Sequence, residues 1–312
     1  MSNLAVNRSA PKQVVSVSLG SSRRDHQSSI NLLGQTVNLS RRGVDGQFND
    51  AIKLLQQLDG EVDAIGLGGI DIYLRSRNRV FELRDGLRLK NAVSNTPVVD
   101  GSGLKDALER QTVKSLQDNG DIELSGKKVL MVCAMDRFGM AEALHEVGAH
   151  TTYGDLIFSL SLDQPILSLE ELEQQAIKLL PEICRLPISM IYPTGKQQER
   201  IEPDELTAPY FDDADVIAGD FHIMRRRLPD SLAGKGILTN TITAEDIEQL
   251  RQRGLSWLVT TTPELDGRSY GTNVLEAALL AVLGKAWEEV TPNDYVELID
   301  AAKLKPRIIR FD

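Results

Sequence analysis

The chain has 312 residues, enough for two domains of ordinary size, and its 41% hydrophobic and 26% charged content is typical of a soluble globular protein. The formal net charge of -10 argues against a general nucleic-acid-binding or anionic-membrane-binding surface, because both require a basic field. No run of about 18 consecutive apolar residues occurs, so the sequence predicts no membrane-spanning helix.

The N-terminal tail and the cysteines indicate where the protein works. Residues 1–12 are polar and lack the apolar core of a signal peptide, so we expect a flexible tail. Cys133 and Cys184 lie in apolar segments, and the four histidines are scattered. We therefore expect buried thiols in a reducing, cytoplasmic compartment, with neither a disulfide nor a metal site.

Residues 13–125 are predicted to form an N-terminal α/β domain, because short apolar strands alternate with amphipathic helices. The predicted elements are, in chain order, strand Gln13–Leu19, hairpin Ile30–Leu33 with Thr36–Leu39, helix Gln47–Leu58, strand Val62–Leu67, hairpin Ile72–Leu74 with Val80–Leu83, helix Asp85–Val93, strand Pro97–Val99 and helix Lys105–Asp118.

Residues 126–290 are predicted to form a doubly wound parallel-sheet, Rossmann-like domain with six strands and crossover helices. Ser168 and Thr243 are expected to cap two of these helices. The predicted strands are Lys127–Cys133, His150–Tyr153, Pro187–Tyr192, Ala214–Ala218, Gly236–Thr239 and Trp257–Thr261. The predicted helices are Met135–Ala149, Leu169–Leu180, Ala244–Arg253 and Gly271–Gly284, and Pro193–Tyr210 is expected to be mostly loop or short helix.

Residues 291–312 are predicted to form a C-terminal helix, Pro292–Leu304, and an extended tail, Arg307–Phe311. This tail is expected to pack back across the junction of the two domains. The apolar helix Val274–Leu283 is interpreted as a buried core helix, and the alternative is a subunit interface of a homo-oligomer.

The unit from Lys127 to Asp155 has the strand–turn–helix–strand layout of a dinucleotide-binding sheet. The three glycine positions of its turn hold Ala134, Asp136 and Gly139. Only Gly139 is kept, and its expected role is close packing of helix on strand. Asp136 places bulk and negative charge where backbone normally approaches a pyrophosphate, or it acts as a helix N-cap.

Two further residues decide whether this turn can take a nucleotide. Arg137 could bind phosphate at the helix N-terminus, and Asp155 stands where a carboxylate holds a ribose hydroxyl. If a cofactor binds, Asp155 favours NAD over NADP, because a carboxylate repels a 2′-phosphate. The alternative for the whole unit is a Rossmann-like fold that binds no cofactor. The alternative for Asp155 is an ordinary turn residue at the end of a strand.

Polar residues also follow the later strands of this predicted sheet, where ligands of open α/β sheets bind. Thr260 is predicted to be one of the cofactor-binding residues. His222 is a candidate catalytic group, and the alternative interpretation is that it is an ordinary polar residue. The polar strand ends are Asp220 with His222, Asn240 with Thr241, and Thr260–Thr262.

In the first domain, Asp100 and Lys105 flank the turn Gly101–Gly103, whose backbone N–H groups could cradle an anion. Lys105 is a candidate for proton transfer in a desolvated cleft, and Ser102 is a candidate substrate-binding residue. The alternative is a capping turn with a solvated lysine.

Two more glycine- or serine-rich strand ends, Gly20–Arg24 and Gly66–Gly69, suggest a rim that faces a ligand. Ser21 and Arg23 are candidate substrate-binding residues there, and the arginines Arg23 and Arg24 suit a carboxylate or a phosphate. The arginines of the predicted hairpin tip are interpreted as solvated surface; they are Arg75, Arg77 and Arg79.

This layout resembles the shikimate/quinate 5-dehydrogenase family over most of residues 13–285. The resemblance implies a substrate domain, a Rossmann NAD(P) domain and a catalytic cleft between them. The family's catalytic lysine lies on a strand-end loop, where Lys105 is the nearest match. Its partner aspartate follows an Asn-Thr pair, but no Asn-Thr-Asp occurs in this sequence, and Asp100 is a candidate substitute. Residues 271–275, Gly-Thr-Asn-Val-Leu, are similar to the start of the family's last helix.

Two functions follow from the sequence. The first is an NAD(P)-dependent oxidoreductase on a small anionic hydroxy acid, in which Lys105 is the acid/base group and Asp100 or His222 assists it. The second is a non-catalytic ligand-binding or interaction protein that kept the fold and lost the cofactor site, as Asp136 suggests.

Overall fold

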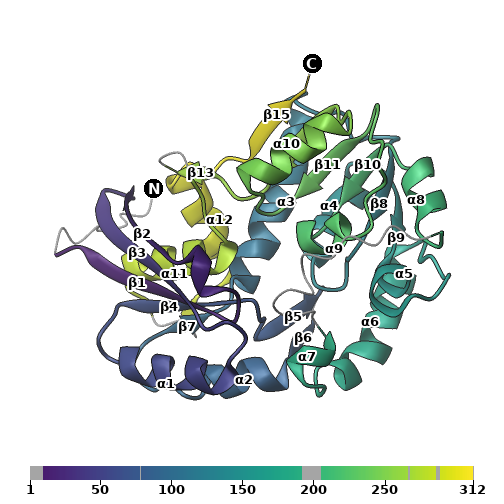
Figure 1. Ribbon diagram of the computed structural model, residues 1–312. Helices are drawn as coiled ribbons and strands as arrows, with labels where there is room; N and C mark the ends of the chain where they lie inside the picture. Colours follow the sequence, from purple (N-terminus) through teal and green to yellow (C-terminus); the bar gives the residue numbers. More distant parts are fainter. Residues whose placement is uncertain (1–9, 78, 192–204, 266–267, 286–288, 312) are drawn as a thin grey trace.

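The computed structural model describes residues 10–77, 79–191, 205–265, 268–285 and 289–311. Two parallel sheets stand side by side, the first on the left and the second on the right of Figure 1. Helices cover both faces of each sheet, and the fold is therefore a two-part α/β fold with parallel sheets, as predicted.

The first sheet has five strands in the order β2-β3-β1-β4-β7. All neighbours pair in parallel except β2, which forms an antiparallel hairpin with β3. The parallel strands end at one edge, which brings the loops after them together. The strands are β1 (Lys12–Ser18), β2 (His26–Leu32), β3 (Gln35–Gly43), β4 (Ala64–Gly68) and β7 (Val98–Val99).

Alternating side chains of the first sheet fill two hydrophobic clusters. Val15 and Val17 of β1 face α1 (Phe48–Leu58) and α2 (Arg84–Lys90). Val14 faces the other way, into a cluster with α11 (Thr272–Leu283) and α12 (Pro292–Ala301). The amphipathic helix predicted for Gln47–Leu58 is confirmed, with Leu55 fully buried.

Helix α11 lies on the first sheet, where it packs against β1 and β4. The sequence placed this helix with the second sheet, because it follows that sheet's strands along the chain, and that placement is wrong. Gly66 of β4 explains the close approach, since a side chain there would meet the backbone of Asn273 at 2.5 Å. The apolar residues Leu275 and Ala277–Leu280 are thus covered within the chain itself.

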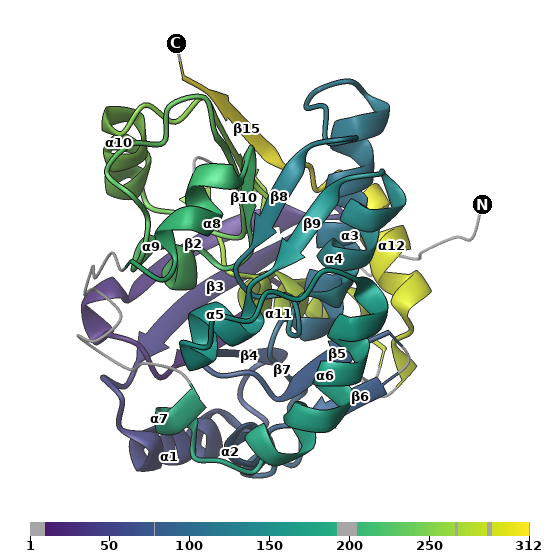
Figure 2. The ribbon, with the colours of Figure 1, turned by 90° about the vertical axis from the view of Figure 1, so that its right-hand side faces the viewer.

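The second sheet has six strands in the order β15-β12-β11-β10-β8-β9, and Figure 2 shows it in front of the first sheet. All neighbours are parallel except β15, which is antiparallel to β12. The strands are β8 (Lys128–Met131), β9 (His150–Tyr153), β10 (Val216–Ala218), β11 (Gly236–Thr239), β12 (Trp257–Thr260) and β15 (Arg307–Arg310).

The strand predicted for Pro187–Tyr192 is wrong, because residues 188–191 form helix α7 (Ile188–Ile191). A short apolar run fits either a strand or one buried helical turn, and periodicity alone does not separate the two. The sixth strand comes instead from the C-terminal tail as β15. Most of the predicted loop Pro193–Tyr210 lies outside the described residues.

The helices of the second half cover its sheet on both faces, and their predicted N-caps are confirmed. The Ser168 side chain accepts the N–H of Glu171, and Thr243 forms a reciprocal capping box with Asp246. These helices are α4 (Phe138–Glu146), α5 (Asp155–Leu160), α6 (Leu169–Ile183), α8 (Ala208–Asp213), α9 (Phe221–Arg225) and α10 (Ala244–Gln252).

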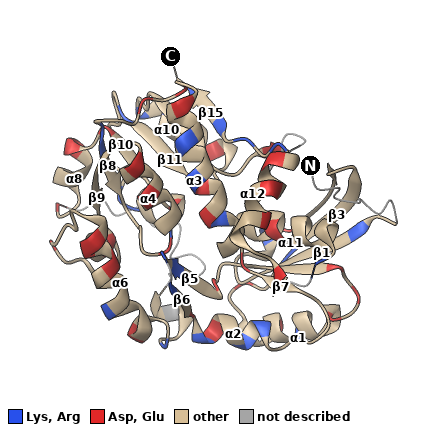
Figure 3. Ribbon diagram, turned by 180° about the vertical axis from the view of Figure 1, so that it is seen from behind, with Lys and Arg blue, Asp and Glu red and all other residues tan. Residues whose placement is uncertain are grey.

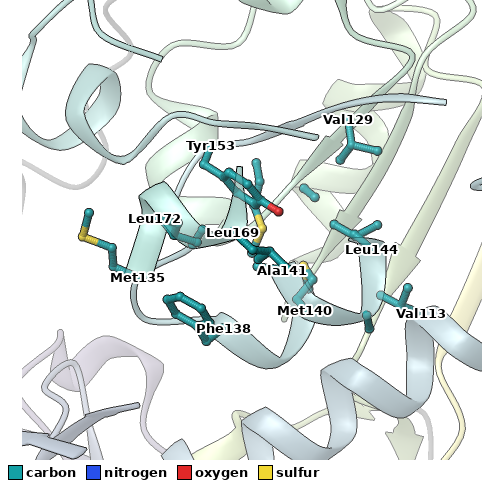
Figure 4. Close-up of a cluster of buried hydrophobic side chains, with 14 of the residues drawn as sticks. Val113, Val129, Met135, Phe138, Met140, Ala141, Leu144, Tyr153, Leu169 and Leu172 are labelled. Carbon is teal, nitrogen blue, oxygen red and sulfur yellow. The ribbon is translucent and has the colours of Figure 1, made fainter. Parts of the chain in front are cut away.

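The face of the second sheet under α4 and α6 holds a dense apolar cluster, drawn in Figure 4. Phe138, Met140 and Leu144 of α4 meet Leu169 and Leu172 of α6 there. The spacing of Phe138, Met140 and Leu144 in the sequence places them on one face of the predicted helix Met135–Ala149, and the structure confirms that this face is buried.

Helix α3 (Ser102–Asp118) joins the two halves. Leu104 and Leu108 in its first half belong to the cluster of the first sheet, whereas Val113 and Leu116 belong to the cluster of the second. A hairpin, β5 (Tyr73–Ser76) with β6 (Arg79–Glu82), also reaches toward the second half. The remaining short elements are the 3-10 helix η1 (Ser22–Arg24) and the hairpin of β13 (Glu264–Leu265) and β14 (Arg268–Ser269).

Candidate functional site

The carboxyl ends of the two sheets meet at Lys105 and Asp136. Lys105 follows β7 in the first turn of α3, Asp136 follows β8, and their charged groups are 3.5 Å apart. A small cavity of about 10 Å³ opens here, roughly the space of one water molecule. The cavity is lined by Tyr73, Arg75, Ser102, Lys105, Asp106, Asp136, Arg137 and Phe138.

Lys105 is the central cation of this pocket, and only 8% of its surface is exposed. Burial by itself lowers the pKa of its ammonium group, but the carboxylates of Asp136 and Asp71 outweigh burial and raise that pKa. The ammonium group therefore stays charged at neutral pH. This charge suits it to hold an anion rather than to accept a proton.

Asp71 is a member of this cluster that the sequence did not single out. It follows β4, in the strand-end segment Gly66–Asp71. Burial, with the nearby carboxylates of Asp100 and Asp136, raises the pKa of Asp71 to about 6, although Lys105 pulls it down. Its position at the end of a buried glycine-rich strand was the pattern that could have identified it.

Asp100 fixes the loop that shapes one side of the pocket. One carboxylate oxygen accepts the backbone N–H groups of Ile72 at 2.6 Å and Tyr73 at 2.9 Å, and the other accepts that of Ser102 at 2.9 Å. These bonds tie the start of β5 to the start of α3. The structure thus gives the Asp100 carboxylate a structural part, with both oxygens already bound to N–H groups.

The turn before α3 already holds the chain's own carboxylates. Gly101 has a φ of +93°, and its N–H donates to Glu276 of α11 at 2.6 Å. The N–H groups predicted to bind an anion are therefore already hydrogen-bonded within the chain. That of Ser102 donates to Asp100, and that of Gly101 donates to Glu276. Burial raises the pKa of Glu276 to about 7, and the Tyr295 hydroxyl of α12 donates to the same carboxylate.

The dinucleotide-type turn after β8 is likewise bound by a carboxylate of the chain. The N–H groups of Ala134 and Met135 both donate to Oδ1 of Asp155 at 2.9 Å. Asp155 is 7% exposed, and its Oδ2 has no hydrogen-bond partner among the described residues. Burial raises the pKa of this carboxyl to about 7, against the lowering effect of the two N–H groups. Asp155 thus binds the N–H groups that a pyrophosphate would need.

Arg137 closes the crevice between β8 and β10, the point where a doubly wound sheet usually binds its ligand. Its guanidinium group, almost fully buried, binds Glu109 of α3 and lies 2.9 Å from Asp220 after β10. Asp220 in turn accepts the side-chain amide of Asn240 at 2.7 Å. Arg137 is thus already paired with two carboxylates.

Charge pairing keeps Arg137 and Asp220 ionised at this crevice. Burial lowers the pKa of the Arg137 guanidinium, but Glu109, Asp136 and Asp220 outweigh burial and raise it. Burial raises the pKa of Glu109 to about 7, whereas Arg137 outweighs burial at Asp220 and lowers the pKa of that carboxyl. The charged side chains pair with one another across this crevice, so it does not offer a ligand open space.

Gly139 lies in α4 where that helix crosses α3. A side chain there would meet the backbone oxygen of Asp106 at 2.5 Å. The close packing expected of Gly139 is therefore against helix α3, and the expected packing against a strand is wrong. The hydroxyl of Thr260, fully buried at the end of β12, donates to the carbonyl of Thr262 at 3.1 Å.

The remaining predicted site residues lie outside the cavity lining. His222 is exposed on α9, and its backbone N–H donates to Asp220 at 2.8 Å. Ser21 caps η1 by accepting the N–H of Arg23, whose side chain is exposed. Lys105, Ser102, Asp136 and Arg137 are the predicted residues that the structure brings together.

The predicted solvated arginine cluster is wrong for Arg75, whereas Arg77 is exposed as predicted and also forms ion pairs. Arg75 lines the cavity, and its Nε is buried without a hydrogen-bond partner among the described residues. Arg77 pairs with Glu142 of α4 at 3.1 Å and Glu173 of α6 at 2.9 Å. Figure 3 shows basic positions in blue on β5 and acidic positions in red on α6. Arg79 is exposed, as predicted.

Two negative findings apply to the described part of the chain. No group of three or more His, Cys, Asp or Glu side chains there is arranged to hold a metal ion. None of the helices in those ranges is long and apolar enough to cross a membrane.

The sequence comparisons identify a family. The model of a family described as "Domain of unknown function (DUF8754)" matches residues 103–311. The chain belongs to this family. A second model, "Domain of unknown function (DUF8753)", matches residues 13–100. No curated protein matches the chain.

Solved structures similar to this member of the DUF8754 family include both solute-binding proteins and dehydrogenases. A solute-binding protein of an ABC transporter from Burkholderia multivorans is 13% identical, with 96% of this chain and 99% of that chain covered and a TM-score of 0.36. L-tryptophan dehydrogenase from Nostoc punctiforme is 12% identical, with 94% and 81% covered and a TM-score of 0.38. Glutamate dehydrogenase from Thermus thermophilus is 12% identical, with 95% and 75% covered and a TM-score of 0.40. No ligand or activity of this chain follows from likenesses at these scores.

Proposed function

We propose that the protein binds a small hydroxy acid in the pocket around Lys105, without a dinucleotide at the turn after β8. The observation that carries this proposal is the buried ammonium group of Lys105, set between the carboxylates of Asp136 and Asp71 in a cavity lined by residues of both halves. Such a cluster can bind an anion and its neighbouring hydroxyl groups at the same time.

The chemistry of the pocket favours this class of ligand. Lys105 and Arg75 donate only, so they match the carboxylate of the ligand. The ionised carboxylate of Asp136 can accept hydrogen bonds but cannot donate them, so it matches the hydroxyl groups of the ligand. The Ser102 hydroxyl can donate or accept. The cavity of about 10 Å³ is too small for such a ligand, so binding requires the two halves or the β5–β6 hairpin to move apart.

The turn after β8 does not fit a dinucleotide in the usual way. The N–H groups of Ala134 and Met135 are bound to Asp155, and Arg137 is bound to Glu109 and Asp220. A pyrophosphate would have to displace a buried carboxylate and then lie beside Asp136. No redox step is therefore assigned to this site.

Ligand titration tests the proposal. Quinate, shikimate and malate are added separately, and the unfolding temperature and binding heat are measured for the native chain and for Lys105→Gln. We expect at least one acid to raise the unfolding temperature by several degrees at saturation, because a ligand that binds only the folded state stabilises it. We expect Lys105→Gln to lose this shift.

Lys114→Gln is the matched control, because Lys114 lies on the same helix but is half exposed and paired with Glu146. It should keep the full ligand-induced shift. An absence of any shift with the panel, or an equal shift in Lys105→Gln, would overturn the proposal.

A second candidate is an NAD(P)-dependent oxidoreductase on a small hydroxy acid, as the resemblance to shikimate/quinate 5-dehydrogenases implies. The observation that favours it is the parallel β8–α4–β9 unit in register, with Asp155 directly after β9. It predicts binding of NADH or NADPH and NAD reduction that depends on the acid. If neither nucleotide shifts the unfolding temperature at millimolar concentration, this candidate fails while the first still stands.

We also propose a cellular compartment for the protein. Cys133 and Cys184 are both buried free thiols, which is the observation that supports a reducing, cytoplasmic compartment. Burial raises the pKa of the Cys184 thiol to about 11 and holds the pKa of the Cys133 thiol well above its usual range, so both stay protonated and unreactive.

A further inference from the structure

Two guanidinium groups converge over Gly20, at the carboxyl end of β1. An added side-chain carbon on Gly20 would lie 2.7 Å from Nη2 of Arg24, 3.0 Å from Nη2 of Arg41 and 3.3 Å from the hydroxyl oxygen of Ser18. The three groups therefore point at one small region above the Gly20 backbone. Gly20 can hold them there only because it has no side chain.

Arg41 is fixed in this arrangement. Its side chain is 12% exposed, and it donates to the carbonyl of Ser21, to Asp25 at 2.8 Å and to the Ser18 hydroxyl at 2.9 Å. Asp25 also accepts the N–H of Gly43 at 2.7 Å, which locks the loop onto β3. The site is thus preorganised before any ligand arrives.

Arg24 has no such neutralising partner. Its guanidinium group makes no hydrogen bond or ion pair with any residue in the described ranges, although it lies beside another cation. The nearby acidic groups are engaged elsewhere, because Asp25 binds Arg41 and Asp45 binds Ser22 at 2.8 and 2.7 Å. One uncompensated positive charge remains next to a buried guanidinium.

The Ser18 hydroxyl supplies a third donor. It already accepts two hydrogen bonds, from Arg41 at 2.9 Å and from the backbone N–H of Gly20 at 3.1 Å. Its own proton is therefore left to donate outward. Two guanidinium groups and a hydroxyl in one place match the several oxygens of a phosphate group.

We propose that Arg24, Arg41 and Ser18 form a binding site for the phosphate group of a small metabolite above Gly20, separate from the pocket around Lys105. The surroundings support this. Arg23, next to Arg24 on η1, is also exposed, so positive charge gathers at this loop on a chain whose net charge is -10. A phosphate relieves the repulsion between the two guanidinium groups, which a neutral sugar cannot do.

Calorimetric titration with inorganic phosphate tests the site, at constant ionic strength set with sodium chloride. We expect saturable binding by the native chain and at least a tenfold weaker affinity for Arg24→Gln. Gly20→Ala should weaken binding similarly, because the added methyl group displaces the end of Arg24 from the convergence point. Arg24→Lys should keep part of the affinity, since it restores the charge without the planar fork.

Arg23→Gln is the matched control, being the exposed neighbour on η1 that does not face Gly20. It should change phosphate affinity less than threefold. Equal losses for Arg23→Gln and Arg24→Gln would mean diffuse attraction to a basic patch and would overturn the proposal, as would an absence of saturable binding at tens of millimolar. Titration with acetate at the same concentration tests whether the site prefers a carboxylate to a phosphate. Tighter binding of acetate than of phosphate would also contradict the proposal. Lys105→Gln should leave phosphate binding intact, so this result is independent of the hydroxy-acid pocket.

Discussion

The carboxylate of Asp155 accepts the backbone N–H of Ala134 at 2.9 Å, so the end of β9 is tied to the turn after β8. In a dinucleotide-binding unit these two positions serve one ligand, the turn through its phosphates and the strand end through a ribose. Here the two positions bind each other, because the acidic side chain is short and buried and so bonds the nearest N–H groups. The fold of a cofactor unit is retained while its donors are occupied.

The bond predicts the stability of two Asp155 variants. Asp155→Ala leaves the N–H groups of Ala134 and Met135 buried and unbonded, and each such group costs about 1–3 kcal/mol. Asp155→Asn keeps an acceptor and should cost much less. Urea unfolding measures both, with the exposed Asp118→Ala as a control expected within about 0.5 kcal/mol of the native chain. Equal losses for Asn and Ala would contradict this part of the structure.

Arg137 predicts a larger effect. Arg137→Met removes the partner of Glu109 and Asp220, and breaking a buried ion pair costs about 3–5 kcal/mol, because it leaves uncompensated charge inside the protein. Adding Glu109→Leu should recover part of that loss, since the fully buried carboxylate is then gone. Equilibrium unfolding in urea of the single and double variants gives the coupling free energy between Arg137 and Glu109. Arg251→Gln is the control, because Arg251 forms an exposed ion pair on α10, and it should change stability by under about 1 kcal/mol. No recovery in the double variant would show that Glu109 is not the buried partner.

Glu276 predicts how stability changes with pH. Its pKa in the folded chain is raised to about 7, whereas an unfolded glutamate has a pKa near 4.3. The folded state thus holds an extra proton between these values, so its contribution is fully present below about pH 4 and is lost as pH rises through about 7. Asp155 and Glu109, also raised to about 7, act in the same direction.

Stability should therefore fall from pH 5 to pH 8, and Glu276→Gln should flatten the slope by up to about 1.4 kcal/mol per pH unit. Chemical unfolding at several pH values measures this slope. The glutamine carbonyl oxygen still accepts the Gly101 N–H, and the glutamine NH2 group can donate to the Tyr295 hydroxyl oxygen, so the variant should fold. Identical slopes for the two proteins would show that Glu276 does not carry the extra proton.

The sequence predicted elements well where local pattern decides them. The helical spacing of Phe138, Met140 and Leu144 and the caps Ser168 and Thr243 depend on neighbours within a few residues. Helix α11 is apolar on nearly all sides, so its sequence required burial but did not specify which sheet would cover it. Its place on the first sheet depends on close approach at Gly66, a contact between distant parts of the chain.

The candidate site shows the same division. Lys105 and Asp136 were found from strand ends, because parallel strands bring their carboxyl ends together. The partners of Arg137 could not be found that way, since Glu109 and Asp220 lie 28 and 83 residues away in sequence. Nothing local distinguishes an arginine that binds phosphate from one that binds two buried carboxylates.

Arg77 predicts how the pocket opens. Its ion pairs with Glu142 and Glu173 hold the turn of the β5–β6 hairpin on α4 and α6, and the same hairpin supplies Tyr73 and Arg75 to the cavity lining. Because Arg77 is partly exposed and screened by solvent, Arg77→Ala should cost under about 1 kcal/mol of global stability. The hairpin itself should loosen, so its amides should exchange hydrogen several-fold faster, as mass spectrometry of the exchanged peptides would measure. High salt should produce a similar acceleration in the native chain, since it screens the same pairs. Arg79→Ala, at an exposed position of the same hairpin, should leave exchange unchanged, and an equal acceleration there would mean that the ion pairs of Arg77 do not hold the hairpin.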